Sequence, residues 1–170
     1  TLNGPGATDV DNLTETLVNV SSLETGIIND LNLAISITGV SFDLSVFLTH
    51  VDTGTTATIW LSDNLNGGHF FTDTNTMFDD EAALDFHPNY GTVVAPSFRS
   101  VDLLSIFDGE SIGGTWQLSI TNTGCCDGEG DDLISWSINA DVMDVPEPTS
   151  LAIFALGMIG LASRRFKKQS

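Results

Sequence analysis

Hydrophobic and polar residues alternate along much of the chain between residues 20 and 143. In segment 115–121, Trp116, Leu118 and Ile120 fall on one face and polar residues fall on the other. An alternation of period two is typical of a strand with one buried face. The pattern predicts strands at residues 33–40, 43–51, 56–62, 69–72, 115–121 and 133–142.

Two further segments repeat this alternation and supply additional core faces. The first contains Phe42, Leu44, Val46 and Leu48, and the second contains Ile134, Trp136, Ile138 and Ala140. The spacing of the runs favours an antiparallel sheet over βαβ units, and no helical period of adequate length precedes residue 148. We therefore expect an all-β, jelly-roll-like antiparallel β-sandwich over residues 21–144. Residues 1–20 are expected to be a lead-in segment with an edge strand at residues 17–20.

The chain changes character at Pro146-Glu147-Pro148, because two prolines around one residue continue neither a strand ladder nor a helix. Residues 151–162 are apolar throughout and are followed by a cluster of four cations, Arg164, Arg165, Lys167 and Lys168. The run predicts a short C-terminal hydrophobic helix of about 18 Å, less than the roughly 30 Å of a bilayer core. The cations after it predict a cytoplasmic C-terminus and an exported body. Residues 145–170 thus form a separate tail.

The charges are distributed unevenly between these two parts. The chain has five basic and 23 acidic residues, a net charge of −18. Residues 1–145 hold 22 of the acidic residues but only one basic residue, Arg99, which gives the body a net charge of −21. A body this acidic repels a phosphate backbone, so nucleic acids are excluded as its partners.

Two groups of acidic residues are candidates for a calcium site, the only cofactor that the sequence suggests. Asp79 and Asp80 lie in one loop, and Asp127, Asp131 and Asp132 lie in another that is rich in glycine. Short carboxylate side chains on loops suit hard cations. The alternative is a solvated acidic surface without a metal, and no EF-hand or repeat-type calcium motif is matched.

The two cysteines, Cys125 and Cys126, are adjacent in the second of these loops. They can pair with each other in a strained vicinal ring or with another chain, and the flanking glycines favour the ring. Neither arrangement would staple the fold. The absence of CxxC spacing argues against zinc.

No catalytic arrangement is evident, so we expect a protein that is not an enzyme. GxSxG is absent, and His50, His69 and His87 are scattered along the chain. Trp60 is interpreted as a core residue, with a carbohydrate-stacking platform as the alternative. The chain starts at Thr1 without an apolar leader, which is expected of a mature form after signal-peptide removal or of an excised fragment.

The tail resembles the PEP-CTERM sorting signal of Gram-negative bacteria. The resemblance rests on Pro146, Glu147 and Pro148, the apolar run, and the cluster that begins at Arg164 and Arg165. It implies export, transient anchoring in the inner membrane through residues 149–163, and processing near Glu147 by an exosortase.

The body resembles the P domain (Homo B domain) of furin- and kexin-like proteases over roughly residues 21–142. The likeness rests on three segments. The first is Val46-Phe47-Leu48-Thr49-His50 with Ala57-Thr58-Ile59-Trp60-Leu61-Ser62, and the second is Met77-Phe78-Asp79-Asp80-Glu81-Ala82. The third is Leu104-Ser105-Ile106-Phe107-Asp108-Gly109-Glu110 with the strands around Trp116 and Trp136. Asp131-Asp132 stands where the family has a glycine, and Thr55-Thr56 where it often has an aspartate. The resemblance implies a jelly-roll sandwich without catalytic residues.

Together these features predict an exported, non-enzymatic β-sandwich of the bacterial envelope or extracellular matrix with a structural or adhesive role. Its expected partners are the exosortase, the inner membrane, and extracellular polysaccharide or other envelope proteins. The alternatives are the C-terminal P domain of a secreted subtilisin-like protease and a polysaccharide-binding module.

Overall fold

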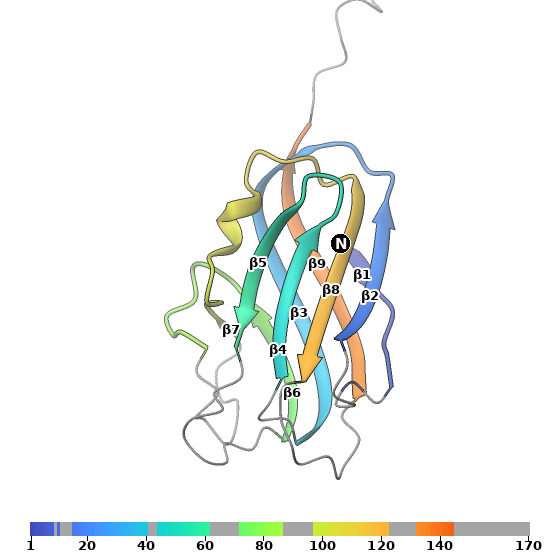
Figure 1. The fold of residues 1–170 in the computed structure, drawn as a ribbon. Coiled ribbons are helices and arrows are strands. Elements are labelled where there is room, and N and C mark those ends of the chain that lie inside the picture. The colour runs from blue at the N-terminus through green and yellow to red at the C-terminus, as the bar shows by residue number, and fades with distance from the viewer. Residues whose placement is uncertain are drawn as a thin grey trace, which may run out of the picture.

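Strands account for almost all of the regular structure in the part of the chain that the structure describes (Figure 1). This computed structural model describes residues 1–8, 10, 15–40, 44–61, 72–86, 97–122 and 132–144. In chain order the elements are β1 (Leu2–Gly4), β2 (Glu15–Ser22), β3 (Ile27–Val40), β4 (Leu44–His50), β5 (Thr55–Trp60), β6 (Thr72–Phe78), β7 (Ser97–Phe98), the 3-10 helix η1 (Leu104–Phe107), β8 (Gly114–Asn122) and β9 (Asp132–Met143).

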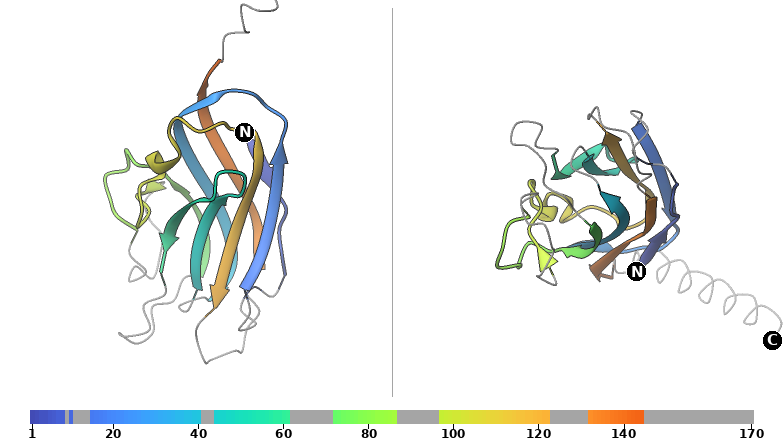
Figure 2. Two further views of the ribbon diagram at one scale, coloured as in Figure 1. Left: turned by 45° about the horizontal axis from the view of Figure 1, so that its top comes forward. Right: turned by 90° about the horizontal axis from the view of Figure 1, so that it is seen from below.

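The strands form two sheets that face each other. One has the order β1-β9-β3-β6-β7 and the other the order β2-β8-β4-β5. Neighbouring strands are antiparallel except for β6 and β7, which are parallel. Seen along the strands, the sheets enclose a common interior, with β1 beside β2 at one corner (Figure 2). The β-sandwich predicted from the alternation is confirmed. The expected C-terminal helix lies outside the described residues.

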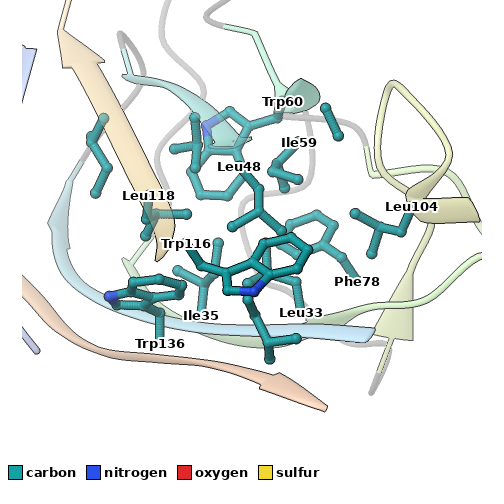
Figure 3. Close-up of a cluster of buried hydrophobic side chains, with 14 of the residues drawn as sticks. Leu33, Ile35, Leu48, Ile59, Trp60, Phe78, Leu104, Trp116, Leu118 and Trp136 are labelled. Atoms are coloured by element: carbon teal, nitrogen blue, oxygen red, sulfur yellow. The ribbon is translucent and has the colours of Figure 1, made fainter. Parts of the chain in front are cut away.

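The core is the layer between the sheets, and the alternating residues fill it. Trp116, Leu118 and Ile120 of β8 are each 0% exposed. They face buried residues of the other sheet across the interior, as the close-up shows for Leu33, Ile35, Leu118, Trp116 and Trp136 (Figure 3). Burying side chains of this size contributes about 1.5 to 3 kcal/mol each to folding, so this layer supplies most of the driving force.

A bulge in β9 changes one of the predicted core positions. The pairing of β3 with β9 runs from Ser36↔Ser135 to Ile37↔Leu133, which leaves Ile134 as an extra residue. Ile134 is 53% exposed, whereas Leu133 is buried. The prediction that Ile134 faces the core was therefore wrong. An inserted residue shifts the alternation by one place, and strict period-two counting does not register it.

The sandwich begins earlier than the boundary expected at residue 21. β1 pairs with β9, and Leu2, Val10 and Val18 are buried in the core. The edge strand predicted at residues 17–20 is confirmed as β2, the first strand of its sheet.

The alternation predicted a strand at residues 69–72, but β6 begins at Thr72. Residues 69–71 lie outside the described residues. The sequence of β6, TDTNTMF, is mostly polar. Among its described side chains, those of Thr76 and Phe78 are buried. Too few apolar positions remained for the pattern to reveal this strand.

Candidate functional site

A buried histidine and a glutamate join two loops at the end of the sandwich where β9 finishes. His50 is the last residue of β4 and its side chain is 1% exposed. Its Nδ1 lies 2.8 Å from Oε2 of Glu110, and its Nε2 lies 3.1 Å from the carbonyl oxygen of Gly113. Both ring nitrogens therefore lie within hydrogen-bonding distance of an oxygen atom.

Two threonines complete the surroundings of the Glu110 carboxylate. The Thr53 hydroxyl donates to Oε2 at 2.9 Å, and the Thr55 hydroxyl donates to Oε1. Burial by itself would raise the pKa of Glu110, but the hydrogen bonds from Thr55, His50 and Thr53 outweigh it and hold the pKa below its ordinary value of 4.5. We call His50, Thr53, Thr55 and Glu110 the polar clasp, because they tie the β4–β5 turn to the loop before β8.

The polar clasp is packed against the core through Trp116. The His50 and Trp116 rings are stacked with centroids 4.3 Å apart, and the indole Nε1 donates to the Ile112 carbonyl oxygen at 3.1 Å. Gly114 follows this loop with φ +120°, and a Cβ there would lie 2.8 Å from His50 Nε2. The site is thus filled by its own side chains, which suits a structural junction.

The sequence indicated His50 only as a strand-end residue and did not indicate Glu110 as its partner. The two residues are 60 positions apart. The available signal was indirect, since both belong to segments that carry the likeness to the P domain. His69 and His87 lie outside the described residues.

The acidic residues proposed for calcium lie in separate places. Phe78, just before Asp79, pairs with Leu33 of β3, whereas Asp132 pairs with Thr38. Five residues along a strand correspond to about 17 Å, so Asp132 is remote from Asp79 and Asp80. Asp127 and Asp131 lie outside the described residues. In the described part of the chain, no group of three or more His, Cys, Asp or Glu residues is placed to hold a metal ion.

Asp80 has a clear structural role. Its two carboxylate oxygens each accept a backbone N–H, from Leu104 and from Ser105, both at 2.8 Å. Asp79 accepts the N–H of Glu81 at 2.8 Å. The two hydrogen bonds of Asp80 anchor the start of η1 to the segment directly after β6. The calcium hypothesis at Asp79 and Asp80 stays a prediction.

Two further carboxylates, Asp30 and Asp108, lie near this junction, and the sequence did not group them with Asp79, Asp80 and Glu81. The pKa of Glu81 is raised by its hydrogen bond with the Asp79 side chain and by the charges of Asp30 and Asp79. The pKa of Asp108 is raised by burial and by the charges of Asp30 and Asp80. Asp30 lies on β3 and Asp108 follows η1, so only the tertiary fold brings them together.

All three tryptophans belong to the core. Trp60 is 6% exposed and packs against Phe78 and Phe86, with ring centroids 5.6 and 5.3 Å apart. The core interpretation of Trp60 is confirmed, and this ring is not a surface platform for carbohydrate. Trp116 and Trp136 are buried as the alternation predicted.

The sorting residues Pro146, Glu147, Pro148, Arg164 and Arg165 lie outside the described residues, as do Cys125 and Cys126. The last described residue is Asp144, directly after β9. Among the residues that the structure describes, no helix has the length and apolar character needed to cross a membrane.

Comparison with known proteins identifies the tail. Residues 144–168 match the PEP-CTERM protein-sorting motif. The sorting signal predicted from the Pro-Glu-Pro, the apolar run and the terminal cations is confirmed. It implies export, sorting and an exosortase-type processing partner.

The body has similarity to solved structures at low identity. A serine protease of Aeromonas sobria in complex with its chaperone is 18% identical and has a TM-score of 0.49, covering 85% of this chain and 28% of that one. The serine protease of Aeromonas sobria in a second structure is 18% identical with a TM-score of 0.46, covering 82% of this chain and 27% of that one. This chain thus spans little more than a quarter of the length of those proteins. No curated protein matches the chain.

Proposed function

We propose that this protein is an exported, non-enzymatic β-sandwich that its C-terminal signal delivers to the bacterial envelope or extracellular layer, where it has a structural or adhesive role. One observation carries the proposal. β9 ends at Met143, and the sorting motif begins at residue 144, so the last core strand runs directly into the sorting segment. The sandwich is therefore the part of the chain that the signal delivers.

The polar clasp supports a role without catalysis. Among the residues that the structure describes, His50 is the only histidine. Its Nδ1 lies against the Glu110 carboxylate and its Nε2 against the Gly113 carbonyl oxygen. A general base must reach the proton that it removes, and a ring with 1% exposure is closed to substrate.

The test uses Glu147, the single acid between two prolines. Changing Glu147 to Ala should block processing and leave a larger, membrane-bound species, because cleavage requires the acidic side chain that the extended backbone presents. Asp144→Asn is the matched control, since it removes a neighbouring acid outside the Pro-Glu-Pro sequence. Equal mature size for the Glu147→Ala variant and the unmodified protein on a gel would refute the sorting role.

The second candidate function is the C-terminal P domain of a secreted subtilisin-like protease. The segments that resemble the P domain include β4, β5 and β8, and these three strands are neighbours in one sheet in the order β8-β4-β5. A Ser/His/Asp protease domain encoded directly upstream of Thr1 would favour this candidate. A signal peptide at that place would favour the first proposal.

Trp60 was the aromatic residue that suggested polysaccharide binding, and its burial in the core removes that support. Glycan-array binding that depends on another, exposed aromatic side chain would restore it.

A further inference from the structure

The chain leaves the sandwich beside the loop that joins β2 to β3 (Figure 1). Met143, at the end of β9, pairs with Ile27 at the start of β3. A Cβ added to Gly26 would lie 3.5 Å from the Met143 carbonyl oxygen. Residues 23–26 of this loop therefore lie next to the point where the chain continues into the sorting segment.

Contacts with the loop before β8 hold the β2–β3 loop in place. The Ile112 N–H donates to the Gly26 carbonyl oxygen at 3.0 Å, and the Glu24 N–H donates to the Ser22 hydroxyl oxygen at 3.1 Å. A Cβ added to Gly113 would lie 2.5 Å from the Glu24 carbonyl oxygen, so the two loops are in close backbone contact. The β2–β3 loop thus has a fixed position at the end of the sandwich.

Two large hydrophobic side chains are exposed at this place. Leu23 is 100% exposed and Met143 is 56% exposed. We call residues 23–26 together with Met143 the exit surface. Removing apolar surface from water is favourable, and a loop that is already ordered loses little further freedom when a partner binds. The exit surface is therefore suited to contact with another molecule.

The processing point lies within a short reach of the exit surface. Glu147 is four residues after Met143, and four residues span at most about 14 Å when fully extended. Glu147 precedes the apolar run and the cations follow it, so Glu147 and the sandwich lie on the same side of the membrane when the run is inserted. An enzyme that acts next to Glu147 therefore has its active site close to the sandwich.

We propose that the exit surface is a docking surface for the processing enzyme, which contacts the sandwich in addition to the Pro-Glu-Pro sequence. This inference rests on the proposed function, because its premise is processing next to Glu147. Three residues, Asp144, Val145 and Pro146, separate Met143 from Glu147. An enzyme that binds the extended chain before Glu147 has no more than these residues before it meets the folded sandwich.

The charges around the exit surface favour a protein over lipid as the partner. Glu24, Asp141 and Asp144 are exposed here. An anionic bilayer surface attracts Lys and Arg and repels carboxylates, so lipid alone is a poor partner for this end of the sandwich. A protein can place apolar side chains against Leu23 and donors or cations against the carboxylates.

The first experiment measures the rate of processing of the full chain by pulse-chase labelling in the bacterium that produces it. Leu23→Asp should slow the conversion of the larger to the mature species several-fold, because it places a charge in the apolar contact. Leu17→Asp is the matched control, since Leu17 is 48% exposed and lies on β2 six residues before Leu23, about 20 Å away. It should be processed at the rate of the unmodified protein.

Two further arms test the position of the contact and the identity of the partner. A six-residue Gly/Ser spacer inserted after Asp144 lets the enzyme reach Glu147 without the sandwich, so Leu23→Asp should not slow processing further in the spacer variant. The photo-crosslinker p-benzoylphenylalanine at position 23 should give an adduct that mass spectrometry identifies as the processing enzyme. The same crosslinker at position 17 should give no such adduct.

The docking proposal is overturned if Leu23→Asp is processed at the unmodified rate, if Leu17→Asp slows processing equally, or if the Leu23→Asp effect persists with the spacer. Adducts of position 23 with lipid alone would also overturn it and would make the membrane the partner. Glu147→Ala separates the two proposals. If Glu147→Ala is processed normally, the sorting role itself fails, whereas a block by Glu147→Ala without an effect of Leu23→Asp removes the docking surface alone.

Discussion

The imidazole ring of His50 lies flat on the indole ring of Trp116, with an angle of 8° between the two planes. The indole is 0% exposed and contacts Phe107 with its ring, while the imidazole is held by Glu110 and the Gly113 carbonyl. This stacked pair therefore connects the hydrophobic core with the polar clasp at the end of the sandwich.

Trp116→Ala should destabilise the protein by about 3 to 5 kcal/mol, because it removes a buried large aromatic side chain and leaves a cavity under His50. Chemical denaturation measures the free energy of unfolding. Ile134→Ala, at an exposed position, is the control and should change it by less than about 0.5 kcal/mol. An unchanged midpoint of denaturation for Trp116→Ala would show that the packing assigned to this ring is incorrect.

Glu110→Gln should lower the free energy of unfolding at neutral pH by about 1 to 3 kcal/mol, because the substitution removes the charge that the His50 ring and the two threonines contact. The folded-state pKa of Glu110 is lowered, so the ionised carboxylate contributes its stability fully above the ordinary value of 4.5. That contribution is lost as the pH falls through the lowered pKa.

The difference between Glu110→Gln and the unmodified protein should therefore be largest at neutral pH and shrink as the pH falls below about 4.5. Urea denaturation across this pH range measures it. Glu24→Gln, at an exposed position, is the matched control. A difference that grows on acidification would contradict the assigned hydrogen bonds.

Asp80→Ala should destabilise the protein by about 1 to 3 kcal/mol, since it leaves the backbone N–H groups of Leu104 and Ser105 without their acceptor. Asp80→Asn, which keeps one acceptor oxygen, should lose less. The loss should be the same in chelator as in calcium-containing buffer if the role is purely structural. A melting temperature of the unmodified protein that falls on adding chelator would instead support calcium binding, because a ligand of the native state stabilises it by mass action.

Alternation along the strands was sufficient to predict the sandwich because each sheet buries one face. It placed Trp116, Leu118 and Ile120 in the core, and each is fully buried. It failed at Ile134, where a bulge shifts the register, and at β6, where polar residues conceal a strand. Both failures have one cause, since the neighbouring strand decides pairing and register and the local sequence does not.

The sorting signal of the tail could be predicted from the sequence, whereas the polar clasp could not. Proline geometry, an apolar run and clustered cations are local properties, so the sequence by itself determined the sorting signal and the strongly acidic character of the body. The contact between His50 and Glu110 joins residues 60 positions apart, and the crowding of Asp30 with Asp108 joins β3 to the loop after η1. Only the tertiary structure decided these contacts, because hydrogen bonds and charge repulsion depend on distance in space, which the packing of the two sheets sets.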